Sequence, residues 1–247
     1  MAIKHFFEQE KHTRNYLLPY LQHHIPNLAG CRVLEIGCAE GGFLHTLTKI
    51  GLDVQGVELS ADRVATALKH APDVRIQVGD ITDPEITNQI GSQFDLIVLR
   101  DVIEHIPQRE SAFSNLNKLL KESGYLYVTF PPKLSAFGGH QQNMRSAIKF
   151  IPFFHLLPEA LIRKIGSGLK ENALSIGQIL KIYESSLTIS EFENLCERYN
   201  FDFRVKELFC SRPVFKIRFG LPIIRFPDIP CIREFIATGC ECLLQKL

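Results

Sequence analysis

The chain has 247 residues, 45% of them hydrophobic and 22% charged, with a formal net charge of +1. This composition supports an ordinary globular core and excludes a strongly basic chain that would attract nucleic acid through its overall field. No stretch approaches the about 20 consecutive apolar residues of a membrane span, and residues 1–10 lack the apolar core of a secretory signal. The seven cysteines, none in CxxC spacing, are expected to be small buried side chains in a reducing cytoplasm.

The first half of the chain alternates short apolar strands with amphipathic helices, which is the pattern of a parallel sheet with helices on both faces. The expected strands are 33–36, 54–59, 75–78, 94–99 and 125–130, and the expected helices are 42–50, 60–70, 84–90 and 111–122. Ser60 is the expected cap of the second helix, and Gly124 is expected to close the fourth.

The second half of the chain does not continue this alternation of strands and helices. Residues 144–187 read as mostly helical and unusually apolar, above all the segment FIPFFHLLPEALI at 150–162. A helix over 190–200 follows, with Ser190 as its cap and Glu193 as the partner in a capping box. The remaining expected segments are a loop at 133–140, a sixth strand at 201–209, a proline-punctuated excursion at 210–235 and a last strand at 239–245.

These elements predict one doubly wound, Rossmann-like α/β domain over residues 1–247. Residues 1–30 are expected to form an N-terminal helical cap. Residues 133–187 are expected to form a helical insertion after the fifth strand that covers the carboxyl edge of the sheet.

The first expected strand runs into the glycine-rich turn VLEIGCAEGGF, residues 33–43. Such a turn between a strand and a helix lets a ligand approach the backbone, at the edge where open α/β sheets bind their ligands. The spacing is GxxxGG, which breaks the GxGxxG fingerprint of a dinucleotide site. Glu35 precedes the first glycine, and a carboxylate there suits a cationic ligand, such as a sulfonium or ammonium group, better than a pyrophosphate.

Two more acidic residues end the next two strands. Glu58 follows the glycine turn by roughly 20 residues, where a carboxylate can accept hydrogen bonds from ribose hydroxyls. Asp80, in VGDI, can accept from an adenine amino group while Ile81 packs on the ring. Each residue alone could be a solvated strand end, but three acids on successive strands favour a cofactor that combines adenosine with a positive charge.

Residues 33–130 resemble the class I S-adenosylmethionine-dependent methyltransferases, and are similar to the ubiquinone-biosynthesis O-methyltransferase-like group. The motifs that carry the resemblance are VLEIGCAEGGF, GVELS, VGDI, FDLIVLRDVIEHI and GYLYVTFPP. It implies a seven-stranded sheet with an antiparallel last strand and S-adenosylmethionine as the cofactor. It also implies a cofactor site made of Glu35, Gly37, Cys38, Gly41 and Phe43 around the amino-acid part, Glu58 and Leu59 at the ribose, Asp80 and Ile81 at the adenine, Arg100, Asp101 and Val102 along the cofactor, and Tyr16 from a helix folded over it.

A sulfonium activates its own methyl group, so the protein mainly positions the acceptor, and a hydroxyl acceptor also needs a general base. His105 is one candidate, and Asp101, Glu104 and His105 would share one face if this stretch is helical. Their spacing resembles the magnesium-associated cluster of ubiquinone-biosynthesis O-methyltransferases and of small-RNA terminal methyltransferases. Hard magnesium prefers oxygen ligands, so a packing role beside the cofactor and no metal are expected.

His140, in the loop FGGHQQ just beyond the fifth strand, is the preferred candidate for the base or for an acceptor-orienting group. The alternative is that His140 is an ordinary histidine of a surface loop without a role in catalysis. The insertion 133–187 is the expected lid that forms the acceptor pocket. Its apolar stretch 150–162 is interpreted as a core or pocket helix, with a dimer surface or a membrane-surface contact as alternatives.

The leading functional hypothesis is therefore a methyltransferase acting on a small-molecule hydroxyl, on a sugar, a lipid-linked compound, a quinone or a secondary metabolite. No NPPY-type tetrapeptide follows the fourth strand, where the sequence reads RDVI, so methylation of nucleic-acid bases is disfavoured and no nucleic-acid partner is expected. Two alternatives remain. One is a non-catalytic relative that only binds the cofactor, and the other is an NAD-dependent Rossmann oxidoreductase, against which the GxxxGG spacing and Asp80 both argue.

Overall fold

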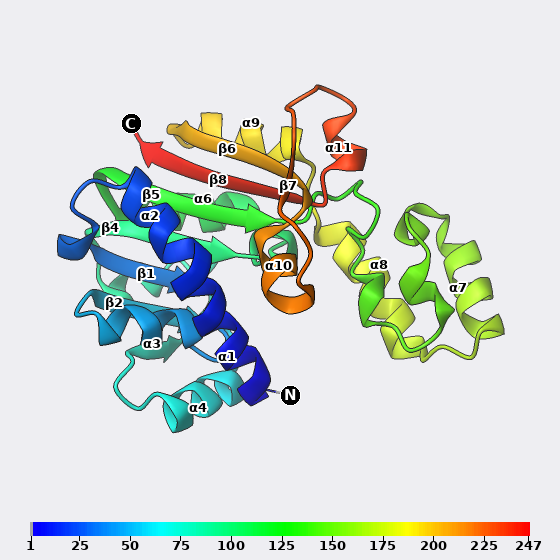
Figure 1. The fold of residues 1–247 in the computed structure, drawn as a ribbon, viewed down its shortest axis with the longest axis horizontal. Helices are drawn as coiled ribbons and strands as arrows, with labels where there is room; N and C mark the ends of the chain where they lie inside the picture. The colour runs from blue at the N-terminus through cyan, green and yellow to red at the C-terminus, as the bar shows by residue number, and fades with distance from the viewer. Residues whose placement is uncertain (1) are drawn as a thin grey trace.

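A twisted eight-stranded sheet, in the order β3-β2-β1-β4-β5-β8-β6-β7, forms the centre of the computed structural model (Figure 1). The structure describes residues 2–247, so Met1 of the expected N-terminal cap lies outside the described residues. The strands are β1 (Arg32–Ile36), β2 (Asp53–Glu58), β3 (Ile76–Val78), β4 (Phe94–Arg100), β5 (Leu120–Phe130), β6 (Phe201–Ser211), β7 (Ile224–Phe226) and β8 (Gly239–Lys246). The doubly wound α/β fold expected from the sequence is confirmed.

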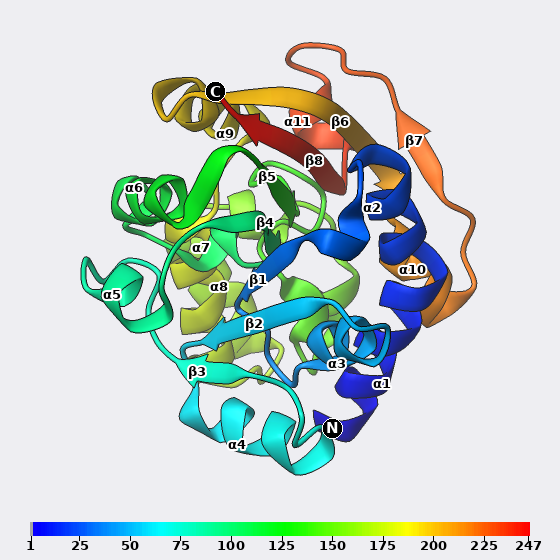
Figure 2. The same ribbon diagram turned by 90° about the vertical axis from the view of Figure 1, so that its left-hand side faces the viewer.

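Helices cover both faces of this sheet (Figure 2). The α-helices are α1 (Ala2–His12), α2 (Leu18–His24), α3 (Gly42–Lys49), α4 (Ala61–His70), α5 (Ile86–Ile90), α6 (Arg109–Leu119), α7 (Glu159–Gly168), α8 (Ala173–Ser185), α9 (Ile189–Arg198), α10 (Pro213–Phe219) and α11 (Arg233–Ile236). A π-helical turn over Thr13–Leu17 joins α1 to α2. Among residues 2–247, none of the helices combines the length and the apolar character that crossing a bilayer requires.

The strand pairing accounts for the apolar character of the central strands. β1 pairs in parallel with β2 and β4, and β4 pairs in parallel with β5. β4 is buried over most of its length because helices cover both of its faces, as its apolar run LIVL at 96–99 predicts. β8 runs antiparallel between β5 and β6, which confirms the antiparallel last strand.

The sheet has one strand more than the seven that were expected. β7 lies within the proline-punctuated excursion and pairs antiparallel with β6 at the edge of the sheet. It is only three residues long and mostly exposed, so it carries no periodic apolar signal that the sequence could show.

Two helix boundaries also differ from the prediction. The capping box of α9 is formed by Thr188 and Glu191 rather than by Ser190 and Glu193, because the helix begins earlier and Ser190 instead bonds to Glu234. Helix α6 ends at Leu119 rather than near Glu122, because Leu120 already pairs with Phe94 of β4. The cap of α4 by Ser60 is confirmed.

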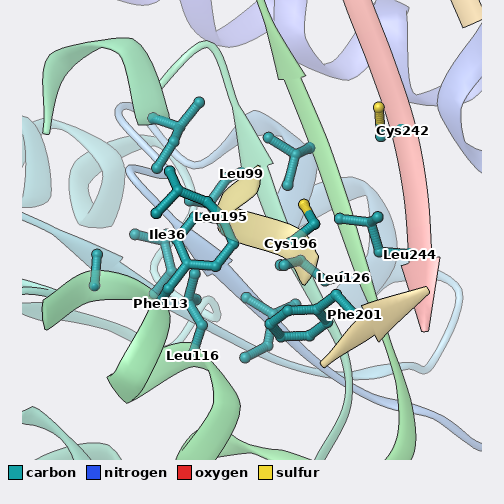
Figure 3. Packing of buried hydrophobic residues seen from close by; sticks show 14 of the residues in the cluster. Ile36, Leu99, Phe113, Leu116, Leu126, Leu195, Cys196, Phe201, Cys242 and Leu244 are labelled. Carbon is teal, nitrogen blue, oxygen red and sulfur yellow. The ribbon is translucent and has the colours of Figure 1, made fainter. Parts of the chain in front are cut away.

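The two faces of the sheet bury separate hydrophobic clusters. One lies under α6 and α9, where Phe113, Leu116, Leu195 and Phe201 pack together (Figure 3). The other lies under α1, α2 and α3. All seven cysteines are free and five of them are buried, with the sulfur atoms of Cys240 and Cys242 only 3.5 Å apart.

The insertion 133–187 extends beyond the carboxyl ends of the strands, where α7 and α8 stand apart from the sheet (Figure 1). It begins with short 3₁₀ turns and continues as helix, close to the expected pattern. It has a small core of its own, made of Met144, Ile148, Phe154, Ile162, Ile176 and Ile179. Arg109 of α6 and Glu104 anchor it to the main domain through hydrogen bonds at Ser185 and Ser186.

Candidate active site

A cavity of about 450 Å³ opens at the carboxyl ends of the strands. It lies over the crevice between β1 and β4, where the strand order changes direction. From there it extends over the ends of β2 and β3 on one side and of β5, β8 and β6 on the other. Open α/β sheets bind their ligands at such a switch point. Residues of α1 and α10 cover the cavity, and no residue of 133–187 lines it. The lid role expected for that insertion therefore stays a prediction.

The turn after β1 is built so that a ligand can approach its backbone. Gly37 has a φ of +68°, and a Cβ there would stand 2.5 Å from a methyl carbon of Val102. Both facts require glycine. Gly41 also has a positive φ and precedes the first turn of α3. The side chain of Gln9 accepts a hydrogen bond from the Gly42 amide at 3.0 Å, which ties α1 to this turn.

Two predicted acids lie on the cavity at the ends of β2 and β3. Glu58 accepts hydrogen bonds from the amides of Ala39 and Ser60, at 2.9 and 3.0 Å, so its carboxylate is held in one orientation. Asp80 accepts from the amide and hydroxyl of Thr82, both at 2.8 Å, through a single oxygen. Its second oxygen stays available beside Ile81.

Nine of the predicted site residues line the cavity together. They are Gly37, Glu58, Leu59, Asp80, Ile81, Arg100, Asp101, Val102 and His105. Cys38, Gly41 and Phe43 are buried and are not part of the lining.

Glu35 does not reach the cavity either. It is 1% exposed, and one of its carboxylate oxygens receives two hydrogen bonds from Arg100, at 2.5 and 3.0 Å. Burial raises the pKa of Glu35 to about 7, against the lowering effect of Arg100. The guanidinium of Arg100 also lies over the ring of Phe43. Direct contact of Glu35 with a bound cation therefore stays a prediction, and the structure adds Arg100 as its partner.

Tyr16 lies away from the cavity lining, and its hydroxyl donates a hydrogen bond to Glu241 at 2.9 Å. The cavity is covered instead by the preceding helix α1, through His5, Gln9 and His12. Burial and the nearby Arg100 lower the pKa of His12 to about 3, so this imidazole is neutral at physiological pH.

The segment after β4 is not the helix on which the shared face was predicted. Asp101 has a φ of +55°, and only a short 3₁₀ turn over Ile103–His105 follows. The prediction that Asp101 shares a face with Glu104 and His105 is therefore wrong, because the backbone changes direction at Asp101. The carboxylate of Asp101 is paired with Arg212. Although burial raises its pKa, Arg212 holds the pKa of Asp101 below its usual value.

Glu104, His105 and His140 form a cluster beside the cavity. The Nε2 atoms of the two histidines lie 3.9 and 4.0 Å from the same Glu104 oxygen, and their rings are 5.1 Å apart. Glu104 is fully buried, and neither of its oxygens has a hydrogen-bond partner among residues 2–247. Burial, with the nearby Asp101, raises its pKa well above the usual value. His140 lies behind His105 and outside the cavity lining, and burial lowers its pKa to about 4.

The same three side chains are the group that could hold a metal ion. Their potential ligand atoms all lie within 4.8 Å of one another. Two imidazole nitrogens and one carboxylate form a donor set that suits a transition-metal ion better than magnesium, which prefers oxygen. The expected absence of a metal stays a prediction.

Sequence reasoning missed the part of the cavity beyond β4. Arg212, helix α10 and Glu241 all come from segments that were read only as an excursion and a last strand. One signal was present. Glu241 is a lone acid in the otherwise apolar strand GCECLL, and a charge in such a strand must face either water or a site.

Comparison with known proteins gives a consistent family. The family model described as "Methyltransferase domain" matches residues 4–204. The chain is 30% identical over 118 residues to the ubiquinone biosynthesis O-methyltransferase of Glaesserella parasuis, covering 45% of this chain and 50% of that protein. It is 31% identical over 113 residues to the protein of the same name in Coxiella burnetii, covering 45% and 48%. The chain thus spans about half the length of the curated relatives it matches.

Solved structures share the fold. An S-adenosylmethionine-dependent methyltransferase from Mesorhizobium loti aligns with a TM-score of 0.58 at 16% identity, over 92% of this chain and 96% of that one. Magnesium protoporphyrin IX methyltransferase from Synechocystis, solved with bound S-adenosylhomocysteine, aligns with a TM-score of 0.56 at 14% identity, over 98% and 84%.

Proposed function

The chain belongs to the family of methyltransferase domains, and from this premise we propose that it transfers the methyl group of S-adenosylmethionine to a hydroxyl oxygen of a small-molecule acceptor. The observation that carries the proposal is the single cavity that combines the glycine turn with Glu58, Asp80 and Ile81 and then continues past β4. The first part fits an adenosyl cofactor, and the second leaves room for a second reactant. The names of the curated relatives, which describe O-methyl transfer, favour oxygen as the methylated atom.

The residues of the chain fit this cofactor. Glu58, held by two amides, is oriented to accept from the ribose hydroxyls, and Asp80 has an oxygen free for the adenine amino group. The bound sulfonium supplies an already activated methyl group. The work left to the protein is to orient the acceptor, to exclude water and to remove the acceptor's proton, of which orientation alone can supply roughly 7–11 kcal/mol.

The proposal is tested by incubating the protein with S-adenosylmethionine and a panel of catechol, 3,4-dihydroxybenzoate, phenol and a simple sugar, and following methyl transfer to each. Transfer to any hydroxyl compound supports the proposal. Binding of S-adenosylhomocysteine without transfer to any acceptor favours the alternative of a non-catalytic relative. The oxidoreductase alternative has no support from the family match.

We further propose that His105 contacts the acceptor and that His140 positions His105. Replacing His140 by Ala is expected to lower the turnover number at least tenfold and to leave the affinity for S-adenosylhomocysteine unchanged, because His140 lies outside the cavity lining. If His140 acts through His105, the double variant His105→Ala/His140→Ala should be no slower than His105→Ala. Steady-state kinetics and calorimetry measure the two effects. A His140→Ala variant with normal turnover would remove the residue from the mechanism.

The apolar insertion is proposed as a surface for a membrane that carries a lipid-linked acceptor. Seven large apolar side chains are exposed there: Phe150, Ile151, Phe153, Leu157, Leu161, Leu169 and Leu174. Arg163, Lys164 and Lys170 lie among them and are also exposed. Exposed apolar side chains beside basic ones suit an anionic membrane surface.

Vesicles of phosphatidylcholine with and without phosphatidylglycerol test this surface by co-sedimentation. The wild-type chain is expected to sediment with the anionic vesicles, and the triple variant Phe150→Ser/Phe153→Ser/Leu157→Ser is expected to stay largely in the supernatant. Phe219→Ser, at an exposed position on α10, is the matched control. Equal sedimentation of the triple variant and wild type would contradict a membrane role. A change in oligomeric state instead would point to the dimer alternative.

A further inference from the structure

The cavity has an acidic side chain in its far half that the cofactor does not need. Glu58 and Asp80 lie at β2 and β3, where the adenosyl part is expected. Glu241 of β8 lies on the other side of β4, where the lining also includes Tyr127, Thr129, Phe209, Arg212 and the α10 side chains Val214 and Ile217. This far half is therefore where the acceptor of the proposed function would bind.

The carboxylate of Glu241 is buried, and a hydrogen bond from the chain fixes one of its two oxygens. It is 3% exposed, and its Oε1 accepts a hydrogen bond from the Tyr16 hydroxyl at 2.9 Å. The Tyr127 hydroxyl is a second donor beside this carboxylate and lowers its pKa. This hydroxyl is buried, belongs to a residue that lines the cavity, and has no other partner among residues 2–247. A buried carboxylate with an unused oxygen on a cavity needs a hydrogen-bond donor to offset its desolvation.

The other acids of the cavity are already engaged. Asp101 is paired with Arg212, and Glu8 is paired with Arg218. Among the acids of this half, Glu241 alone lacks a basic partner within the described part of the chain. A donor group of the acceptor would join the two tyrosine hydroxyls at this carboxylate, which has no basic partner.

Resting on the function proposed above, we propose that Glu241 accepts the proton of the acceptor's hydroxyl group during methyl transfer. The acceptor oxygen forms its bond to the methyl carbon while the carbon–sulfur bond breaks and leaves its electron pair on sulfur. The hydroxyl proton passes to the free oxygen of Glu241. The products are a methyl ether and S-adenosylhomocysteine, and Glu241 then returns the proton to solvent.

The surroundings of Glu241 suit a base that works near neutral pH. Burial raises its pKa to about 7; the Tyr16 hydrogen bond lowers it, Glu207 raises it, and the Tyr127 hydroxyl and the charge of Arg212 lower it. A base is most effective when its pKa lies near the operating pH. Burial lowers the pKa of His105, and it lowers those of His12 and His140 to about 3 and about 4, so these imidazoles are weaker bases than usual. The titratable and charged groups around Glu241 are Tyr16 and Tyr20 from the N-terminal segment, Tyr127 from β5, Glu207 from β6, Arg225 from β7, and Arg212.

The neighbours of Glu241 give a test that a purely structural role would not pass. Glu207 lies directly beside Glu241 in the pairing of β6 with β8. Replacing Glu207 by Gln removes a negative charge, so the pKa of Glu241 should fall. Replacing Tyr16 by Phe removes a donor to the carboxylate, so the pKa should rise. The two changes act in opposite directions on the same group.

The experiment is the pH profile of kcat/KM with the best acceptor of the hydroxyl panel. The wild type should lose activity as the pH falls through about 7, because protonated Glu241 cannot accept a proton. The pH at which activity is lost on this acidic side of the profile should be lower in Glu207→Gln and higher in Tyr16→Phe. Glu241→Gln should lower turnover by about 10²–10⁴-fold, with unchanged affinity for S-adenosylhomocysteine. Glu122→Gln, exposed in β5 at the opposite end of the sheet, is the matched control.

The outcomes separate this role from the proposed function itself. Normal turnover in Glu241→Gln, or an unchanged pH of activity loss in both neighbour variants, overturns the role of Glu241 and leaves the methyltransferase intact. A wild type that binds S-adenosylhomocysteine and methylates none of the hydroxyl compounds overturns both. Methyl transfer to an amine probe such as histamine, with none to hydroxyl compounds, would make Glu241 a site for an ammonium group and overturn the proton-transfer step.

Discussion

Replacing Arg100 by Leu is expected to lower the free energy of unfolding by about 3–5 kcal/mol, which corresponds to a fall in Tm of roughly 10 °C. The reason is that Arg100 is the one hydrogen-bonding partner of the fully buried Glu35 carboxylate in the described chain. Removing one member of a buried pair leaves the other without compensation. Chemical denaturation of the protein without ligand measures the loss.

The loss should depend on pH in a defined direction. Burial already raises the pKa of Glu35 above its ordinary value, and removing Arg100 takes away an opposing influence, so the pKa rises further. A carboxyl whose pKa is raised by folding stabilises fully below the unfolded-state pKa, and this contribution is lost as the pH rises through the folded-state pKa. The loss in free energy of unfolding of Arg100→Leu, relative to the wild type, should therefore be smaller at pH 5 than at pH 8.

Two further variants check the cause. The double variant Glu35→Gln/Arg100→Leu should recover part of the stability, because no charge is then left buried. Arg198 pairs with Glu110 at an exposed position, so Arg198→Leu should cost no more than about 1 kcal/mol. If Arg100→Leu cost as little as this surface control, Arg100 would not be the group that compensates the buried Glu35 carboxylate.

Replacing Glu58 by Ala is expected to weaken binding of S-adenosylhomocysteine by about 10²-fold or more. Hydrogen bonds to a charged group contribute about 1.5–3 kcal/mol each, and the ribose offers two hydroxyls to this carboxylate. The same change removes the acceptor for the amides of Ala39 and Ser60, so the glycine turn also loses its support. Isothermal titration calorimetry measures the affinity directly.

Asp62 is the matched control for Glu58, since it is an exposed acid in the first turn of α4, close in sequence and away from the cavity lining. Asp62→Ala should bind the ligand as the wild type does. A dissociation constant for Glu58→Ala within threefold of that of the wild type would mean that Glu58, at the end of β2, does not bind the ribose hydroxyls.

The sequence was informative where chemistry depends on short-range spacing. The glycine turn, Glu58 and Asp80 each lie at the carboxyl end of a strand, so a correct set of strands was enough to bring them to one edge. The last strand was also predicted from the sequence, whereas its antiparallel direction was implied by the resemblance. Local patterns were weaker at helix ends, where a backbone reversal such as the one at Asp101 has no periodic signature.

The far half of the cavity could not be predicted in the same way. Arg212 lies more than 100 residues from Asp101, and Tyr16 lies more than 200 from Glu241, so both pairs depend on how the last three strands fold back. His140 sits outside the lining for a related reason. Its loop turns toward His155 in the insertion, where a Cβ on Gly139 would meet the His155 ring, instead of over the sheet.

The most direct test of the account is thermal unfolding of the wild-type chain with S-adenosylhomocysteine and, separately, with NADH, each near 1 mM. A ligand at about 100 times its dissociation constant stabilises by about 2.7 kcal/mol, which for this chain length corresponds to a rise in Tm of roughly 5–10 °C. The account predicts that rise with S-adenosylhomocysteine and none with NADH. A rise with NADH alone, or with neither ligand, would contradict it.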